Sequence, residues 1–238
     1  EAGDAKFAER RAMRHARGQL TARENVAALL DEGAELFEYG RYAVAAQRGR
    51  ASIDELMKRS PADGLITGVG TVNGGAFGAA AAKAAVAAYD ATVLAGTQGF
   101  WNHMKLDRII EVAGAQSLPL VLFAEGGGGR PGDTDVEPIA NSQLGVHTFS
   151  RLAALSGSVP LVGLASGYCF AGNAALLGAC DVVIATRGAN IGMAGPAMIE
   201  GGGLGRVLPT QIGPSEEGSA IGVVDVLVAD ETEAVDVA

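Results

Sequence analysis

Short apolar segments that run directly into glycine-containing turns recur along this chain, and they constrain its fold more than any other feature. One covers residues 120–130 (LVLFAEGGGGR), and a second covers residues 161–178 (LVGLASGYCFAGNAALLG). Each apolar segment has the length of a strand, and residues with helical spacing follow it. Strands that alternate with helices in this way form largely parallel sheets. The sequence therefore predicts an α/β fold, and 238 residues suit one large domain.

The spacing of apolar and charged residues predicts helices between these strands. Residues 1–33 are expected to be helical, with a capping box formed by Thr21 and Glu24 and with Gly33 placed to end the helix. Ser52 and Glu55 form a second capping box. Further helices are predicted around residues 52–59, 101–113, 138–156 and 171–180.

The apolar runs predict strands along the whole chain. Asn73-Gly74 is a strong hairpin signal that ends the first of them. The tail after residue 223 begins as a strand and then becomes acidic. Strands are predicted within residues 63–74, 84–96, 117–125, 158–168, 181–193 and 223–228.

Charge and cysteine content exclude several classes of partner. Asp and Glu outnumber Lys and Arg by 27 to 18, a formal net charge of −9, so no general positive field attracts nucleic acid or an anionic membrane. Cys169 and Cys180 form no CxxC pair and have no histidine nearby, so we expect no metal site and no disulfide framework. A reducing cytoplasm suits them. We expect neither a signal peptide nor a membrane span.

The glycine turns at residues 126–129 and 171–173 predict a crevice lined by backbone N–H groups. Such groups, converging at the carboxyl ends of parallel strands, suit a phosphate or an enolate oxygen. The Gly-Lys-Ser/Thr of a P-loop is absent, and Pro131 fits poorly into a dinucleotide fingerprint. Ser166 does not lie in a G-x-S-x-G elbow, so a hydrolytic triad is not predicted.

Longer motifs connect these features to a known family. In order along the chain they are RGQLTARENVAALLDEG, ADGLITGVGTVNG, AEGGGGR, GYCFAGNAALLG, GMAGPAMIEGGGLG and IGVVDVLVADETEA. Together they resemble the carboxyltransferase β subunits of biotin-dependent acyl-CoA carboxylases, of the propionyl-CoA and methylcrotonyl-CoA carboxylase type. AEGGGGR stands where that family usually has DSGGAR, and the fourth motif stands where it has a PCAGGA-like run.

The resemblance implies a crotonase (ClpP-like) fold with parallel sheets and surrounding helices, and a reaction. In this family an acyl-CoA loses its α-proton while backbone amides in an oxyanion hole stabilise the enolate, which then takes a carboxyl group from carboxybiotin. One well-placed donor contributes about 3–4 kcal/mol to such a transition state. The expected cofactor is biotin, as carboxybiotin on a carrier domain or subunit, with an acyl-CoA as substrate and no metal.

The resemblance also assigns roles to residues of the glycine-rich motifs. It places Gly172 and Asn173 at the paired glycines of the second turn, although Asn173 departs from glycine. The predicted catalytic residues are Gly172, Asn173, Gly128 and Gly129. The predicted substrate-binding residues are Gly127, Arg130, Ala171, Gly195 and Pro196.

The same resemblance predicts an organisation and partners. Residues 1–60 are expected to form an N-terminal helical segment, and residues 61–238 the acyl-CoA-binding domain of a carboxyltransferase. The family usually has a C-terminal carboxyltransferase domain as well, and this second domain is expected as a partner, on the same polypeptide or on another chain. Further expected partners are the biotin carboxylase and biotin carboxyl carrier components and a homo-oligomer.

Two alternatives stay open at this stage. One is a stand-alone crotonase-type hydratase or decarboxylase, which would need a positioned acid or base such as Glu125. The other is a non-catalytic assembly module, in which the glycines only shape packing.

Overall fold

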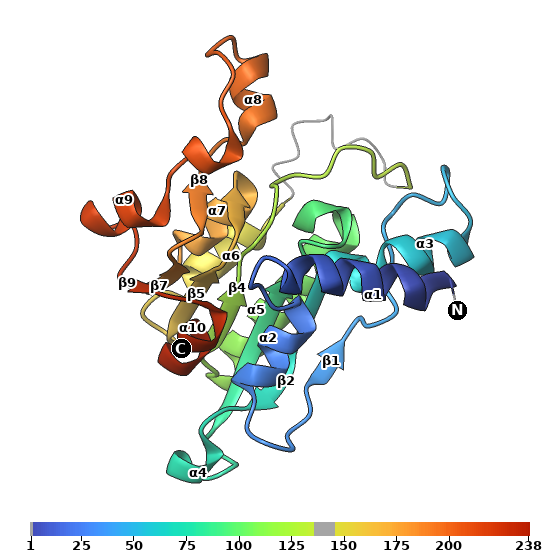
Figure 1. Cartoon of the computed structure of the whole chain (residues 1–238). Coiled ribbons are helices and arrows are strands. Elements are labelled where there is room, and N and C mark those ends of the chain that lie inside the picture. The colour runs from blue at the N-terminus through green and yellow to red at the C-terminus, as the bar shows by residue number, and fades with distance from the viewer. Residues whose placement is uncertain (1, 136–145) are drawn as a thin grey trace.

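A sheet of seven strands runs through the protein, with helices on both of its faces (Figure 1). The computed structural model describes residues 2–135 and 146–238. The strand order is β1-β2-β3-β4-β5-β7-β9; the pairs among β1, β2 and β3 are antiparallel, and all later pairs are parallel. The strands are β1 (Phe37–Tyr39), β2 (Leu65–Thr71), β3 (Lys83–Tyr89), β4 (Leu120–Phe123), β5 (Leu161–Ala165), β7 (Val182–Thr186) and β9 (Val226–Val228). The predicted α/β architecture is confirmed.

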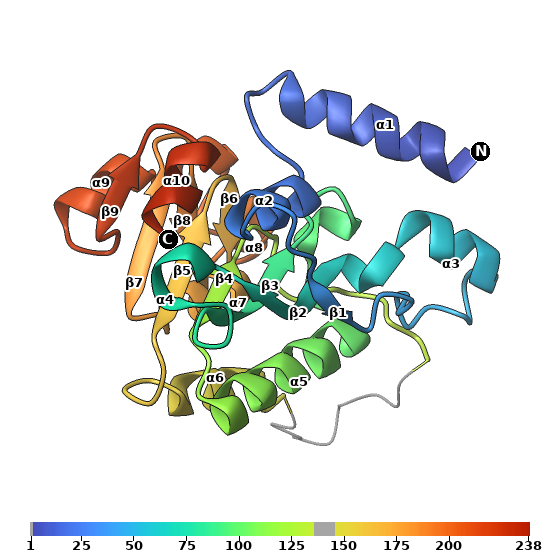
Figure 2. The same cartoon turned by 90° about the horizontal axis from the view of Figure 1, so that it is seen from below.

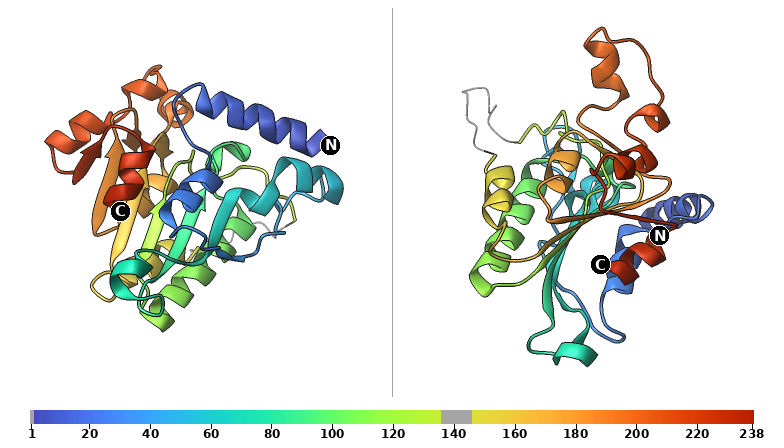
Figure 3. Two further views of the ribbon diagram at one scale, coloured as in Figure 1. Left: turned by 60° about the horizontal axis from the view of Figure 1, so that its bottom comes forward. Right: turned by 90° about the vertical axis from the view of Figure 1, so that its left-hand side faces the viewer.

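Two helical layers cover the two faces of the sheet (Figures 2 and 3). α5 (Phe100–Gln116) and α6 (Thr148–Ala154) cover one face, and α2 (Ala22–Leu29) and α10 (Glu231–Val237) cover the other. The alternation of side chains along β3 divides them between two cores: Ala85 and Ala87 face α5, whereas Val86 and Ala88 face α2. The alanines of this segment thus allow helices to pack closely on both sides of the strand.

The predicted helix over residues 1–33 is two helices. α1 (Ala2–His15) ends before a turn at Gly18, where φ is +71°, and α2 begins after the capping box of Thr21 and Glu24, which is confirmed. α2 ends at the C-cap Leu30, so the prediction that Gly33 ends it is wrong; Gly33 lies in the turn that follows. The predicted boundary at residue 60 does not coincide with a sheet boundary, because β1 pairs with β2.

Other predictions need smaller corrections. The hairpin after β2 is confirmed, but residues 72–82 connect its strands, and Asn73 (φ 61°) begins the short helix α4 (Gly74–Phe77). Of the helix predicted over 138–156, residues 138–145 lie outside the described part of the chain, and the rest forms α6. The acidic tail forms α10, which was not predicted, with Asp230 as its N-cap.

The remaining elements lie around the main sheet. β6 (Tyr168–Phe170) and β8 (Asn190–Gly192) form a small parallel sheet, and α8 extends away from the body (Figure 1). The further helices are α3 (Ile53–Arg59), α7 (Gly172–Leu177), α8 (Pro196–Gly201) and α9 (Ser215–Ala220), with 3₁₀ turns at Pro61–Gly64, Leu94–Gly96 and Pro209–Gln211. Within the described residues, no helix has the length and apolar character that crossing a membrane requires.

Candidate active site

The two glycine turns lie against one another beyond the carboxyl ends of β4 and β5. Gly126 forms a parallel bridge with Cys169. The Gly126 N–H donates to the Tyr168 carbonyl at 2.8 Å, and the Phe170 N–H donates to the Gly126 carbonyl at 2.9 Å. The structure therefore brings together the two turns that the sequence singled out.

Close approaches explain why glycine fills the first turn. Gly128 has φ +85°, and a Cβ there would lie 2.6 Å from the Ala171 Cβ. A Cβ at Gly126 would collide with the Gly96 carbonyl and the Asn173 side chain. Gly129 is exposed, and a Cβ there would meet no atom within 4 Å. Packing thus requires the glycines at 126 and 128, whereas Gly129 borders open space.

In the second turn, the residue with glycine-like backbone angles is Ala171, one position before the Gly172–Asn173 pair that the sequence singled out. Ala171 has φ 52° and ψ −119°, a conformation that favours glycine, and its N–H donates to the Gly192 carbonyl at 2.9 Å. Asn173 lies inside α7. Ala171 is therefore the N-cap of α7, and Gly172 and Asn173 are its first two residues.

The Asn173 side chain has a structural role that the sequence does not indicate. The side chain is fully buried, and its Oδ1 accepts the Gly128 N–H at 2.9 Å while its Nδ2 donates to the Gly96 carbonyl at 3.3 Å. The Gly128 N–H, predicted as a catalytic donor, is therefore already bonded. The N–H of Gly172, in the first turn of α7, has no partner within that helix.

Arg130 holds the base of the first turn instead of facing a ligand. Its side chain is 3% exposed, and its Nη1 pairs with the fully buried Asp63. Nη2 donates to the Thr97 carbonyl at 2.9 Å, and Nε donates to the Thr97 hydroxyl at 3.3 Å. With these donors engaged, the guanidinium is not available to a CoA phosphate or a product carboxylate, so we assign Arg130 a structural role.

A cavity of about 820 Å³ adjoins the turns, and α1 forms part of its wall. Three arginines line it: Arg10 and Arg14, four residues apart on one face of α1, and Arg17, in the turn that follows the helix. The spacing of Arg10 and Arg14 is visible in the sequence, but it was not predicted as part of a site.

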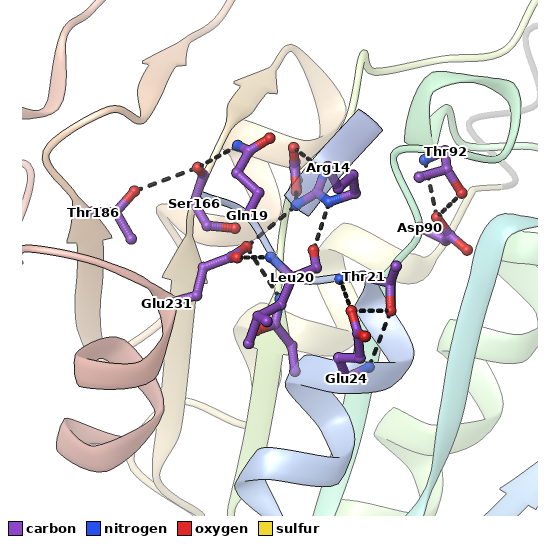
Figure 4. Close-up of polar contacts among 12 residues, drawn as sticks. Arg14, Gln19, Leu20, Thr21, Glu24, Asp90, Thr92, Ser166, Thr186 and Glu231 are labelled. Carbon is purple, nitrogen blue, oxygen red and sulfur yellow. Dashed lines mark hydrogen bonds and ion pairs between the residues drawn. The ribbon is translucent and has the colours of Figure 1, made fainter. Parts of the chain in front are cut away.

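Arg14 links α1 to the interior of this cavity. It donates to both carboxylate oxygens of Glu125 at 2.9 and 2.8 Å. Figure 4 shows Arg14 beside Glu231 of α10, with which it pairs at 3.2 Å. Burial alone would lower the pKa of the Arg14 guanidinium, but the hydrogen bonds and negative charge of Glu125 outweigh it and raise the pKa. Glu231 also accepts from the Leu20 N–H and from Asn25 Nδ2.

The other predicted residues lie at the edges of this region. Gly127 is exposed and lines the cavity. Gly195 and Pro196 begin α8, where a Cβ on Gly195 would meet the cavity-lining Phe170 at 3.5 Å. Among the described residues no histidine lines the cavity, and no group of three or more His, Cys, Asp and Glu side chains is arranged to hold a metal.

Comparisons with known proteins identify relatives of the whole chain. The family model for the carboxyl transferase domain matches residues 13–238. The β1 subunit of biotin-dependent 3-methylcrotonyl-coenzyme A carboxylase from Mycobacterium tuberculosis is 30% identical over 230 residues, which cover 95% of this chain and 40% of that subunit. A solved single-chain, multi-domain long-chain acyl-CoA carboxylase is 56% identical with a TM-score of 0.88, covering 95% of this chain and 22% of that one. The solved transcarboxylase 12S hexamer is 26% identical with a TM-score of 0.79, and the match covers 99% of this chain and 44% of the 12S chain.

These matches bear on the fold and on the extent of the chain. The predicted crotonase-type α/β fold is confirmed by the solved carboxyltransferase structures that match nearly the whole chain. The chain spans 35% and 40% of two of its curated relatives, so it corresponds to a part of each.

Proposed function

Because the chain belongs to the carboxyl transferase domain family, we propose that it binds an acyl-CoA and promotes transfer of a carboxyl group from carboxybiotin to the α-carbon of that thioester. The observation that carries the proposal is the meeting of the Gly126–Gly129 turn with the Ala171–Gly172 turn beside an arginine-lined cavity. Backbone donors at such a meeting point suit an oxygen on which negative charge develops.

The cavity wall supports a CoA thioester as the ligand. Arg14 is occupied by Glu125 and Glu231, whereas no carboxylate among the described side chains pairs with Arg10 or Arg17. Two guanidinium groups that line the same cavity without a carboxylate partner suit the phosphates of CoA. The relative that is 56% identical is a long-chain acyl-CoA carboxylase, so long acyl chains belong in the first tests.

The chemistry assigned to this chain is backbone stabilisation of an enolate. The thioester carbonyl would accept N–H groups of Gly172 and of the exposed Gly129, and the charge that forms on this oxygen as the α-proton leaves would strengthen these hydrogen bonds. Gly127 and Gly129 carry no side chain and are exposed, so the turn leaves room for a second reactant. Carboxybiotin, held on another domain or subunit, would supply the carboxyl group there and a base for the α-proton.

Membership of this family also suggests which domains and subunits act with the chain. We propose that a second carboxyltransferase domain completes the site, that biotin carboxylase and carrier components act with it, and that the assembly is a homo-oligomer. Support comes from relatives named as a multi-domain carboxylase and as a hexameric transcarboxylase core.

Carboxyl transfer by a complete carboxylase containing this chain tests the proposal. We expect Gly172→Pro, which removes one N–H, to lower the rate of carboxylated acyl-CoA formation at least 100-fold. A hydratase or decarboxylase would instead depend on Glu125 as acid or base. Both Glu125 oxygens are held by Arg14, so no observation favours that alternative. Hydration or decarboxylation activity in the wild-type chain, abolished in Glu125→Gln, would contradict the proposal.

A further inference from the structure

We propose that Asn173 is a positioning residue for carboxyl transfer, whose buried carboxamide fixes the spacing of the two backbone turns that hold the thioester oxygen. The inference rests on the proposed function. It assigns Asn173 a role through its side chain, which differs from a role as a direct donor to the substrate.

The contacts of the carboxamide join three backbone segments. Asn173 belongs to α7, its Oδ1 accepts the N–H of Gly128 in the first turn at 2.9 Å, and its Nδ2 donates to the carbonyl of Gly96 at 3.3 Å. The side chain has no exposed surface, and a Cβ on Gly126 would collide with it. The packing therefore leaves the carboxamide little freedom.

No other side chain bonds the glycines of the first turn among the described residues. Gly126–Gly129 contribute no side chains, and glycine has wide backbone freedom. Besides Asn173, only backbone groups bond the glycines. Gly126 is tied to Tyr168 and Phe170, and the Gly127 N–H donates to the Ala95 carbonyl at 3.0 Å. At Gly128 itself, the carbonyl accepts the Gln98 N–H at 2.7 Å, and Asn173 alone holds the N–H. Loss of the Asn173 side chain would remove the tie between this turn and α7.

A second buried carboxamide lies at the same place. The Gln98 side chain is 5% exposed and rests against Gly172, where it occupies the space that a Cβ would need. Among the described residues its Nε2 has no hydrogen-bond partner. The Gln98 side chain therefore packs directly against the backbone of the second turn, with its Oε1 nearest to Gly172.

The backbone amides of the two turns therefore have different roles in catalysis. Asn173 takes the N–H of Gly128, so that donor does not serve the substrate, and it holds Gly129 relative to Gly172. Misplacing donors by a fraction of an ångström weakens transition-state stabilisation more than ground-state binding. Substitution of Asn173 should therefore change kcat and leave acyl-CoA affinity, which depends on the cavity, nearly unchanged.

The test uses [1-¹³C]acetyl-CoA bound to this chain, with the thioester carbonyl stretch read by difference infrared spectroscopy. We expect the wild type to lower the frequency relative to free ligand, and Asn173→Ala to lose at least half of that shift while the Kd changes less than threefold. In a complete carboxylase, kcat should fall at least tenfold with little change in KM. Leu152→Ala, a fully buried change on α6, is the control for destabilisation and should keep the full shift.

Asn173→Asp provides a second readout if the alanine variant folds poorly. Its carboxyl group keeps an acceptor for the Gly128 N–H but donates to the Gly96 carbonyl only when protonated. We expect kcat of this variant, relative to wild type, to fall as pH rises. A full carbonyl shift in Asn173→Ala, or a pH-independent kcat ratio in Asn173→Asp, would overturn the positioning role. Failure of the wild type to bind acetyl-CoA, propionyl-CoA and decanoyl-CoA alike, or to shift the carbonyl stretch of any of them, would instead overturn the proposed function, and this inference with it.

Discussion

The Arg14 guanidinium on α1 binds both carboxylate oxygens of Glu125, 111 residues further along the chain, at 2.9 and 2.8 Å. Glu125 directly precedes the first glycine turn, and the same guanidinium reaches Glu231 on α10. One buried arginine therefore connects the N-terminal helix, the candidate oxyanion turn and the C-terminal helix.

Replacement of Arg14 by Met should destabilise the fold strongly. Two carboxylates, 13% and 5% exposed, would lose their cation, and breaking a buried pair in this way costs about 3–5 kcal/mol. Urea unfolding measures the loss. The control is Arg11→Met on the same helix, whose exposed pair with Glu24 should contribute below about 1 kcal/mol. Equal effects of the two substitutions would refute this account of Arg14.

Lys105 should give the stability a specific pH dependence. Burial lowers the pKa of its ammonium group to about 8 from 10.5, although Nζ donates to the Ala62 and Leu65 carbonyls. Between these values the unfolded chain binds a proton that the folded chain does not, so the contribution of Lys105 to the unfolding free energy rises with pH, by about 3 kcal/mol.

The difference in unfolding free energy between wild type and Lys105→Met isolates this effect, because methionine does not titrate. We expect the difference to shift in favour of the wild type as the pH rises from about 8 to about 10. A difference that stays constant over this range would show that the Lys105 pKa is not lowered by burial.

Two adjacent glycines should respond very differently to alanine. Gly128→Ala would place a Cβ 2.6 Å from that of Ala171 at φ +85°, which should cost about 1–3 kcal/mol and disturb both turns. Gly129→Ala meets no atom within 4 Å and should leave the unfolding free energy within about 0.5 kcal/mol of wild type. Thermal or urea unfolding of the two variants decides the matter, and equal stabilities would contradict the packing described.

The sequence predicted the elements whose causes are local. The apolar strands and the capping boxes at Thr21 and Ser52 follow from residues close together in the chain, and they are confirmed. The two glycine turns meet because each follows one of the neighbouring parallel strands β4 and β5. The motifs also led to the correct family.

What was missed depends on contacts between distant residues. The charged sequence of α1 gives no indication that Arg14 binds Glu125. An arginine that follows a glycine turn normally lies at the surface, whereas Arg130 pairs with the buried Asp63. The Asn173 carboxamide has partners 45 and 77 residues away. Tertiary packing therefore decides which groups of the candidate site are free to meet a substrate.

The arginines of the cavity should carry part of the CoA affinity. Arg10→Gln with Arg17→Gln should weaken CoA binding at least tenfold and reduce its dependence on salt, because two cations near the phosphates are lost. Arg23→Gln on α2, which breaks an exposed pair with Glu38 away from the cavity, is the control and should leave the Kd unchanged. Unchanged affinity in the double variant would mean that the phosphates bind elsewhere.

The central claim is that this chain carries a formed acyl-CoA site at the two turns, and calorimetric titration tests it most directly. Acetyl-CoA, propionyl-CoA and decanoyl-CoA would be titrated into the wild type and into Gly172→Pro, with circular dichroism showing that both are folded. We predict saturable binding of at least one thioester to the wild type, weakened by the substitution through the lost N–H and the strained turn. Folded wild-type protein that binds none of the three, or equal binding by both proteins, would contradict it.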